Sequence, residues 1–277
     1  MPRDPSSLSP AGNIAMSYLA LTRPVSASIG DCELTHLGRE PIDVERARGQ
    51  HGVYVEALRT WGLDVIELPA LDAHPDAVFV EDDCVVVDEV AVITRPGAES
   101  RRGEVESVAA ALASHRELVH MADPATLDGG DVARVGRTFF VGRSTRTNEA
   151  GVVALRAALS PFGYEVVAVD VPGALHLKSA VSALDDETVL VHRPFVDIEP
   201  FITRGLRPVD VPDGEAGGAN VLVHGGGAMV GAAHPRTAEI VANHGLHVTV
   251  VDHGELLKAE AGLTCCSVIL RGAGGVG

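Results

Sequence analysis

The segment Trp61-Gly62-Leu63-Asp64-Val65-Ile66-Glu67-Leu68-Pro69 contains the end of a helix, a short strand and a break in the chain. A glycine just past the last helical residue favours the left-handed conformation that stops a helix, and the β-branched residues after it favour a strand. The same order recurs at 162–169, 204–209 and 244–250, and a weaker copy without the glycine runs from Arg116 to Met121. Copies that recur about every 40 to 55 residues predict a repeated structural module.

Each copy is followed by a polar turn and a second strand, often within a hairpin, as at 76–80, 85–87 and 91–93. Between the hairpins lie helical stretches with apolar residues at three- and four-residue spacing, namely Val44 to Trp61, Arg101 to Ser114, Glu149 to Leu159 and Pro235 to Asn243. Repeated strand–strand–helix–strand units predict an α/β propeller of five modules with pseudo-fivefold repeat. Its helices would lie outside, and its strand ends would converge on a central channel. The alternative is an ordinary doubly wound sheet.

Length and composition limit the domain organisation. A chain of 277 residues with 46% hydrophobic residues can bury a substantial core. We expect one α/β propeller domain at 18–270, preceded by a disordered leader at 1–17 and followed by a flexible tail at 271–277. The leader has no apolar signal core, and no apolar run approaches the roughly 20 residues that span a bilayer, so no membrane association is expected.

The net charge limits the classes of partner to expect, and the cysteine content indicates the cellular compartment. The net charge of −16 argues against nucleic acid and is compatible with a cationic small-molecule substrate. Four cysteines in a chain of this length do not form a disulfide framework, so a cytoplasmic location is expected. A propeller of this kind is expected to be a monomer or a homodimer.

Two neighbouring cysteines, Cys265 and Cys266, start an apolar run that ends at Leu270. In an extended strand, neighbouring side chains point to opposite faces, so this pair is not expected to form an ordinary disulfide. One thiol would face the core and the other a cavity on the loop side. This arrangement is typical of a reactive cysteine.

Other polar residues occur in the turns of successive modules, at 76–83, 126–132 and 174–180. An acid, a histidine and a cysteine contributed by different modules would form a Cys/His/Asp set of the kind used in nucleophilic catalysis. Each residue also has a simpler interpretation, because acids at hairpin ends aid solubility and a histidine between apolar neighbours often fills a core. Adjacent cysteines lack the two- to four-residue gap of zinc ligands, so neither a metal nor a cofactor is expected.

These motifs resemble the dimethylarginine dimethylaminohydrolase family of the guanidino-modifying (pentein) superfamily. The resemblance covers roughly residues 18 to 270 in order. The motifs that carry it are Phe79-Val80-Glu81-Asp82, Ile93-Thr94-Arg95-Pro96-Gly97-Ala98, Ala125-Thr126-Leu127-Asp128-Gly129-Gly130-Asp131-Val132, Phe139-Phe140-Val141-Gly142, Leu175-His176-Leu177-Lys178-Ser179 and Leu263-Thr264-Cys265-Cys266-Ser267-Val268. The family implies the same five-module propeller that the repeat predicts.

The resemblance also implies roles for individual residues. Cys265 resembles the nucleophile, His176 the general acid and base, and Asp128 the carboxylate that orients the histidine. The substrate-binding residues that it implies are Asp82 for the guanidinium, Asp76 and Glu81 beside it, and Arg101 and Arg146 for the α-carboxylate. The chain departs from the family pattern near Ala259 and around Val25, which the family places in a flap over the site.

The activity implied is hydrolysis of Nω-methylated arginines to citrulline and dimethylamine or methylamine, through a covalent thiouronium on Cys265. An arginine deiminase would use the same nucleophile and release ammonia, but its helical insertion is not visible here. An agmatine deiminase would have no carboxylate for Arg101 and Arg146 to bind. A non-catalytic propeller that binds another molecule would not need Cys265, His176 and Asp128 together.

Overall fold

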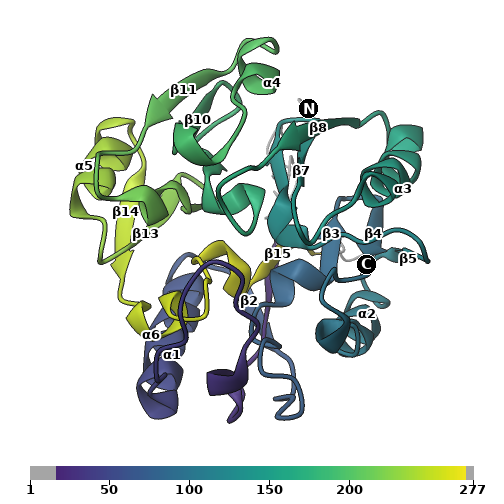
Figure 1. Ribbon diagram of the computed structural model, residues 1–277, viewed down its shortest axis with the longest axis vertical. Helices are drawn as coiled ribbons and strands as arrows, with labels where there is room; N and C mark the ends of the chain where they lie inside the picture. The colour runs from purple at the N-terminus through teal and green to yellow at the C-terminus, as the bar shows by residue number, and fades with distance from the viewer. Residues whose placement is uncertain (1–16, 273–277) are drawn as a thin grey trace, which may run out of the picture.

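Five three-stranded sheets make up the fold in the computed structural model, which describes residues 17–272. Figure 1 shows the sheets arranged around a central axis, with helices at the periphery. In each sheet the first strand of the module is antiparallel to the second, and the second is parallel to the third. The predicted five-module α/β propeller is confirmed. The predicted leader and tail lie outside the described residues, apart from Ser17, Arg271 and Gly272.

Four modules use consecutive strands. Their strands are β3 (Cys84–Val86), β4 (Val90–Ile93) and β5 (Glu117–His120); β6 (Val132–Val135), β7 (Thr138–Arg143) and β8 (Glu165–Asp170); β9 (Val181–Ala183), β10 (Thr188–Val191) and β11 (Arg207–Asp210); and β12 (Leu222–His224), β13 (Gly227–Gly231) and β14 (His247–Val251). The repeated sequence segments form strands, as predicted, and each is the third strand of its module.

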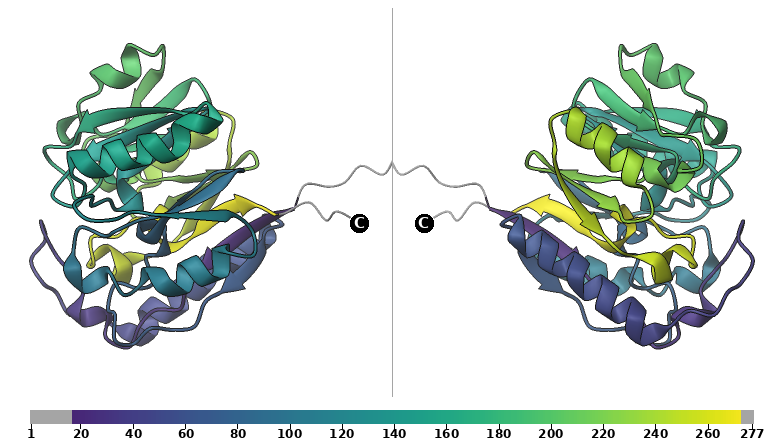
Figure 2. Two further views of the ribbon diagram at one scale, coloured as in Figure 1. Left: turned by 90° about the vertical axis from the view of Figure 1, so that its right-hand side faces the viewer. Right: turned by 90° about the vertical axis from the view of Figure 1, so that its left-hand side faces the viewer.

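The fifth module joins the two ends of the described chain. Its strands are β15 (Val268–Arg271), β1 (Tyr18–Thr22) and β2 (Asp64–Glu67). Strand β15 pairs antiparallel with β1, with Tyr18 opposite Arg271 and Leu21 opposite Val268. Figure 2 shows the yellow β15 beside the purple β1. The propeller is therefore closed by backbone hydrogen bonds between its first and last strands.

A helix connects the second and third strands of each module. These helices are α1 (Val44–Thr60), α2 (Val105–Leu112), α3 (Glu149–Leu159), α4 (Glu199–Ile202) and α5 (Pro235–Asn243), and a further helix, α6 (Gly254–Leu257), precedes β15. The sequence did not predict α4, because it has only four residues and contains a proline in its first turn. None of the helices in the described part of the chain has both the length and the apolar character needed to span a membrane.

A short 3₁₀ turn precedes the first strand of every module. We call these five segments the inner turns: η2 (Val80–Asp83), η4 (Gly129–Asp131), η6 (Leu177–Ser179), η8 (Ala216–Ala219) and η9 (Thr264–Cys266). Contacts join η9 to η2, η2 to η4, η4 to η6 and η6 to η8. The sequence analysis treated Cys265 and Cys266 as part of an extended strand, and the structure corrects this to a compact turn. His176 has an extended backbone, and the turn η6 starts at the next residue, Leu177.

The hydrophobic core is divided among the modules, and one aromatic stack joins two of them. The rings of Phe140 on β7 and Phe201 on α4 lie 4.0 Å apart at an interplanar angle of 14°. Both side chains are fully buried. This contact attaches the short helix α4 to the sheet of the preceding module.

We expect Phe201→Ala to lower the free energy of unfolding by about 3–5 kcal/mol, because it leaves a cavity beside Phe140. Urea unfolding followed by circular dichroism measures the change. Phe162→Ala is the matched control, since Phe162 is 37% exposed. This substitution should lower the free energy of unfolding by less than about 1 kcal/mol. Equal losses in the two variants would contradict the role assigned to the stack.

Candidate active site

A narrow pocket brings together residues from inner turns of three modules. The predicted site residues that line it are Asp76, Asp82, Arg101, Arg146, His176, Ala259 and Cys265. Asp128 lies directly behind His176 and contacts it. Residues that are up to 189 positions apart in sequence, such as Asp76 and Cys265, therefore meet in one pocket because the propeller turns their modules toward a common axis.

Cys265 lies in η9 and is buried, with 8% of its surface exposed. The backbone N–H of Gly262 donates to its Sγ at 3.4 Å. Burial is the main reason that the pKa of the Cys265 thiol lies well above 9.0, and the charges of Glu81 and Asp82 raise it further. The thiol is therefore neutral at pH 7 when no cation is bound beside it.

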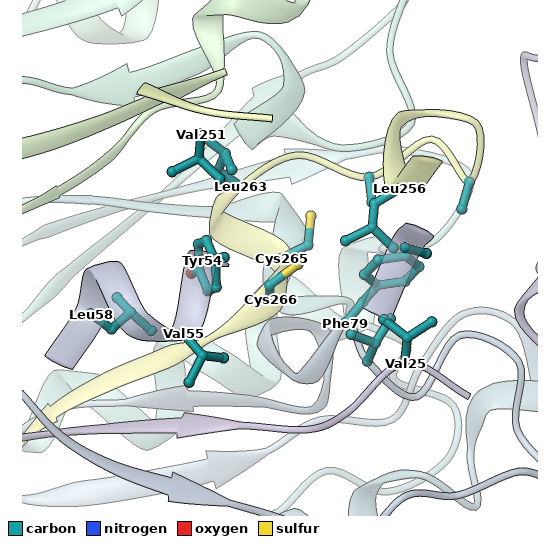
Figure 3. Packing of buried hydrophobic residues seen from close by; sticks show 14 of the residues in the cluster. Val25, Tyr54, Val55, Leu58, Phe79, Val251, Leu256, Leu263, Cys265 and Cys266 are labelled. Atoms are coloured by element: carbon teal, nitrogen blue, oxygen red, sulfur yellow. The ribbon is translucent and has the colours of Figure 1, made fainter. Parts of the chain in front are cut away.

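Cys266 is also buried, at 3% exposure, and belongs to the core cluster that Figure 3 shows around Tyr54 and Val55. Burial raises the pKa of its thiol to about 12. The sequence analysis assigned the two thiols to opposite faces of a strand. The structure instead places both in one 3₁₀ turn, where Cys265 lines the pocket and Cys266 does not.

His176 stands at the start of η6, and its Nε2 lies 3.0 Å from Asp128 Oδ2. The other carboxylate oxygen of Asp128 accepts a hydrogen bond from the backbone N–H of Gly97 at 2.8 Å, which fixes the carboxylate. Burial alone would lower the pKa of His176, but Asp82, Asp128 and the neighbouring carboxylates raise it from 6.5 to about 9. His176 is therefore an imidazolium at neutral pH, and its Nδ1 is the ring nitrogen not paired with Asp128.

Two glycines allow the inner turns to approach this closely. A Cβ on Gly129 would lie 1.9 Å from the carbonyl oxygen of Glu81. A Cβ on Gly130 would lie 2.6 Å from His176 Nδ1 and 2.8 Å from Asp82 Oδ1. The Gly-Gly pair seen in the sequence serves close approach between protein segments, because any side chain here would separate the histidine from the acid.

Asp82 and Arg101 form a buried ion pair. The guanidinium Nη1 donates to Asp82 Oδ2 at 2.6 Å, and the opposite side of the guanidinium donates to Glu104. The Asp82 Oδ1 accepts the backbone N–H of Gly130 at 2.8 Å. Burial would raise the pKa of Asp82, but His176 and Arg101 lower it from 3.8 to about 2, so Asp82 remains an anion.

These contacts change the interpretation of Arg101. The resemblance assigned Arg101 to a substrate carboxylate, together with Arg146. The structure instead places its guanidinium against two carboxylates and the backbone carbonyls of Asp76 and Phe79. Its donors are occupied by protein acceptors, so its geometry suits the orientation of Asp82 rather than the capture of an anion from solution.

The guanidinium of Arg146 makes fewer contacts with protein acceptors than that of Arg101. Its Nη2 donates to the Thr35 hydroxyl at 3.3 Å, and its Nη1 lies 4.0 Å from Asp128 Oδ2. It lines the pocket near Glu33 and Glu260. Because a guanidinium carries five N–H donors, several of its donors remain for a planar anion. Arg146 is the pocket arginine best suited to bind a carboxylate.

The remaining predicted residues differ in position. Asp76 lines the pocket and accepts the backbone N–H of Glu33 at 3.0 Å, and Ala259 also lines it. Glu81 lies outside this lining, because its carboxylate pairs with Lys178 and accepts the Thr264 hydroxyl at 2.8 Å.

Val25 also lies outside the lining, since it is fully buried in the core cluster with Phe79. Figure 3 shows Val25 beneath Phe79. The segment that borders the pocket instead is 33–37, whose backbone N–H groups at Thr35, His36 and Leu37 donate to the carboxylate of Glu260.

The sequence analysis missed several residues that support this site. Asp131 accepts the backbone N–H of Leu177 at 2.9 Å and the Ser144 hydroxyl at 2.6 Å, which fixes the turn after His176. Burial raises the pKa of Asp131 to about 6. Glu104 holds Arg101 three residues away in sequence. The i,i+3 spacing of Arg101 and Glu104 was a usable signal, whereas nothing local identified Asp131 among the acids of its turn.

Asp82, Asp128 and His176 place ligand atoms within 4.8 Å of one another, as a metal site would. Their chemistry does not suit a metal ion. Arg101 already neutralises Asp82, and the raised pKa of His176 keeps its ring protonated, whereas a coordinating imidazole must be neutral. The group is better described as an anionic environment that holds a protonated histidine.

Comparison with known proteins identifies the family. A family profile described as N,N dimethylarginine dimethylhydrolase, eukaryotic, matches residues 36–193. An N(G),N(G)-dimethylarginine dimethylaminohydrolase from Streptomyces coelicolor is 47% identical over 92% of this chain and 98% of its own length. The structure of the Pseudomonas aeruginosa enzyme, a cysteine-to-serine mutant with citrulline, superposes with a TM-score of 0.86 at 32% identity, covering 92% of this chain and 99% of that chain. A dimethylarginine dimethylaminohydrolase adduct with S-methyl-L-thiocitrulline gives a TM-score of 0.85 at the same identity and coverage. This chain therefore belongs to the dimethylarginine dimethylaminohydrolase family.

Proposed function

We infer that this protein hydrolyses Nω-methylated arginines to citrulline and dimethylamine or methylamine. The observation that carries the inference is the meeting of Cys265, the protonated His176 and the anionic Asp82 in one narrow pocket. The relatives add support, since one is described in complex with citrulline and another as an adduct with S-methyl-L-thiocitrulline. A cytoplasmic location and a monomeric or homodimeric state stay predictions.

We propose that the two ends of the substrate are bound by opposite charges. Asp82 would bind the guanidinium, assisted by Asp76, while Arg101 keeps the Asp82 carboxylate oriented. Arg146 would bind the α-carboxylate through its free donors. This arrangement would place the guanidinium carbon over Cys265 in a near-attack geometry.

The protonation states favour a reaction that starts when substrate binds. A neutral thiol is a weak nucleophile, and the anions around Cys265 oppose its ionisation. A bound guanidinium cation would offset these anions, so the thiol would lose its proton to solvent and become reactive once the substrate is in place. The thiolate would then attack the guanidinium carbon and form a tetrahedral adduct.

His176 would act first as an acid and then as a base. Its imidazolium would donate a proton to the methylated nitrogen, so the carbon–nitrogen bond breaks with release of neutral dimethylamine or methylamine. A thiouronium on Cys265 remains. The neutral His176 would then take a proton from water as the oxygen attacks the same carbon. Cleavage of the carbon–sulfur bond, with loss of the remaining hydroxyl proton to solvent, gives citrulline and the thiolate. Asp128 would hold the imidazole in orientation throughout.

The first test is turnover of asymmetric dimethylarginine, arginine and agmatine by the purified protein, with the ureido product and the released amine both measured. We expect citrulline and dimethylamine from the first substrate, and a rate at least about 10³-fold lower in Cys265→Ser, because the thiolate is the nucleophile. Cys32→Ser is the matched control, since Cys32 is a buried free cysteine outside the pocket lining. Citrulline and ammonia from arginine as the main reaction would assign the protein to the deiminases instead.

Arg146→Ala should raise the KM for asymmetric dimethylarginine about 10- to 100-fold, because a charge-assisted bidentate contact contributes roughly 1.5–3 kcal/mol. The change in kcat should be smaller. Arg143→Ala is the control, since Arg143 is 46% exposed and pairs with Asp170 and Glu149. An unchanged KM in Arg146→Ala would exclude the proposed carboxylate contact.

The protonation of His176 predicts how stability depends on pH. Its pKa in the folded protein, about 9, lies above the ordinary value of 6.5, so its stabilising interaction is fully present below pH 6.5 and is lost as the pH rises through 9. Relative to His176→Gln, the wild-type protein should therefore lose free energy of unfolding between these pH values. Urea unfolding of both proteins from pH 6 to 9.5 measures the difference. A difference that is constant or grows with pH would contradict the protonated state.

A further inference from the structure

The inner turns of four modules supply the chemical groups of the site, and the fifth supplies a buried amide. Asp82, Asp128, His176 and Cys265 belong to or border η2, η4, η6 and η9. The remaining inner turn, η8, is followed directly by Asn220, which is 7% exposed and does not line the pocket. Like the residues that carry the chemistry, Asn220 lies in or next to an inner turn.

The amide of Asn220 joins the turn of the nucleophile to the turn of the histidine. Its Oδ1 accepts the backbone N–H of Thr264 at 3.1 Å, and its Nδ2 donates to the Thr264 hydroxyl at 3.1 Å. The same Nδ2 donates to the backbone carbonyl of Lys178 at 2.9 Å. Thr264 directly precedes Cys265, and Lys178 lies two residues after His176. One side chain therefore contacts both catalytic turns.

The backbone beside the sulfur lies directly against this amide. A Cβ on Gly262 would fall 2.2 Å from Asn220 Cγ, closer than any real contact. The N–H of the same Gly262 donates to Cys265 Sγ. The position of Asn220 therefore determines where the backbone donor sits relative to the sulfur, because nothing separates the amide from that glycine.

A second connection closes the network. The Thr264 hydroxyl donates to Glu81 Oε2 at 2.8 Å, and the other oxygen of Glu81 pairs with Lys178. Asn220, Thr264, Glu81 and Lys178 therefore form a ring of polar contacts beneath the two catalytic turns. The hydroxyl of Thr264 accepts from Asn220 and donates to Glu81, so its orientation is defined from both sides.

We propose that Asn220 is a positioning residue that fixes the Cys265 turn relative to the His176 turn and holds the Gly262 N–H against the sulfur. This role rests on the proposed function for its effect on turnover. The contacts require a short side chain with both donors and an acceptor, which asparagine has. Aspartate keeps the shape and the acceptor but loses the donors, and alanine loses all three contacts.

The test compares Asn220→Asp and Asn220→Ala with the wild-type protein. We expect kcat for asymmetric dimethylarginine to fall about 10- to 100-fold while KM changes less than about threefold, because displacement of the reacting groups affects the chemical step. Asn148→Asp is the matched control. Asn148 makes three hydrogen bonds to backbone groups as the exposed cap of α3, and this change should leave kcat unaltered.

A second measurement does not depend on turnover. Alkylation of Cys265 by iodoacetamide, located by peptide mapping, is followed against pH in each variant. The curve should move to higher pH in both Asn220 variants, because the Gly262 N–H that stabilises the thiolate is no longer held in place. If the wild-type protein does not hydrolyse methylarginines, the proposed function fails, and this alkylation curve still decides the role of Asn220.

Variants of the partner residue test whether Asn220 acts through Thr264. Thr264→Val removes the hydroxyl and should lower kcat. Thr264→Ser keeps the hydroxyl and should lower kcat less. The losses of kcat caused by Asn220→Ala and Thr264→Val should be strongly non-additive in the double variant, because both substitutions break the same contact between Asn220 and Thr264. The two Thr264 variants also test the proposal if Asn220→Ala fails to fold.

Two results would overturn the proposal. One is a kcat and an alkylation curve in Asn220→Asp within twofold of the wild-type values. The other is a loss of thermal stability in the Asn220 variants with unaltered kcat per folded molecule, which would mean that Asn220 serves the fold alone.

Discussion

The close packing of the five inner turns around the propeller axis is the constraint on which the rest of the structure depends. The chain closes its ring by pairing β1 with β15, so no module can move outward to relieve crowding at the centre. Backbone then meets backbone, as at Gly129, where even a methyl group would overlap the carbonyl of Glu81. Polar residues of these turns are consequently buried, and they must bind one another.

Burial of these residues produces the electrostatics of the site. Asp82, Asp128 and Asp131 are buried near His176 and Cys265, and Glu81 is half-buried beside them. The cations that offset them close by are Arg101, Lys178, Arg146 and the protonated His176. Burial raises the pKa of the Cys265 thiol, and Glu81 and Asp82 raise it further. Asp82 also raises the pKa of His176, together with Asp128 and Asp131. A cation that enters the pocket therefore improves the balance of charge, whereas an anion near Cys265 would worsen it. The proposed selectivity for a guanidinium and the suppression of the free thiolate would then have one common cause.

The repeat and the five modules could be predicted from the sequence, because glycine stops and short β-branched runs are local signals. The residues Cys265, His176, Asp82, Asp76 and Arg146, which line the pocket, were implied by the family resemblance. Sequence reasoning could not predict features that depend on how separate segments pack together. The inner turns at 177–179 and 264–266 looked extended, since their apolar residues continue into strands. The ion pair of Arg101 with Asp82 lies within one module, but it joins side chains 19 residues apart, and their distance is set only when the turn before β3 packs against the turn after β4. Val25 was assigned to a flap, although its side chain fills the core beneath Phe79.

A repeated scaffold can build an asymmetric site only if equivalent positions carry different side chains. In or next to the inner turns this chain places an acid that accepts hydrogen bonds, a histidine, a thiol and an amide that both donates and accepts. The first three are the groups that we propose to act on a substrate, and each would need a fixed position relative to the others. An amide at the remaining position can hold two neighbouring turns at once without adding charge, which an acid or a base could not do in this already charged centre.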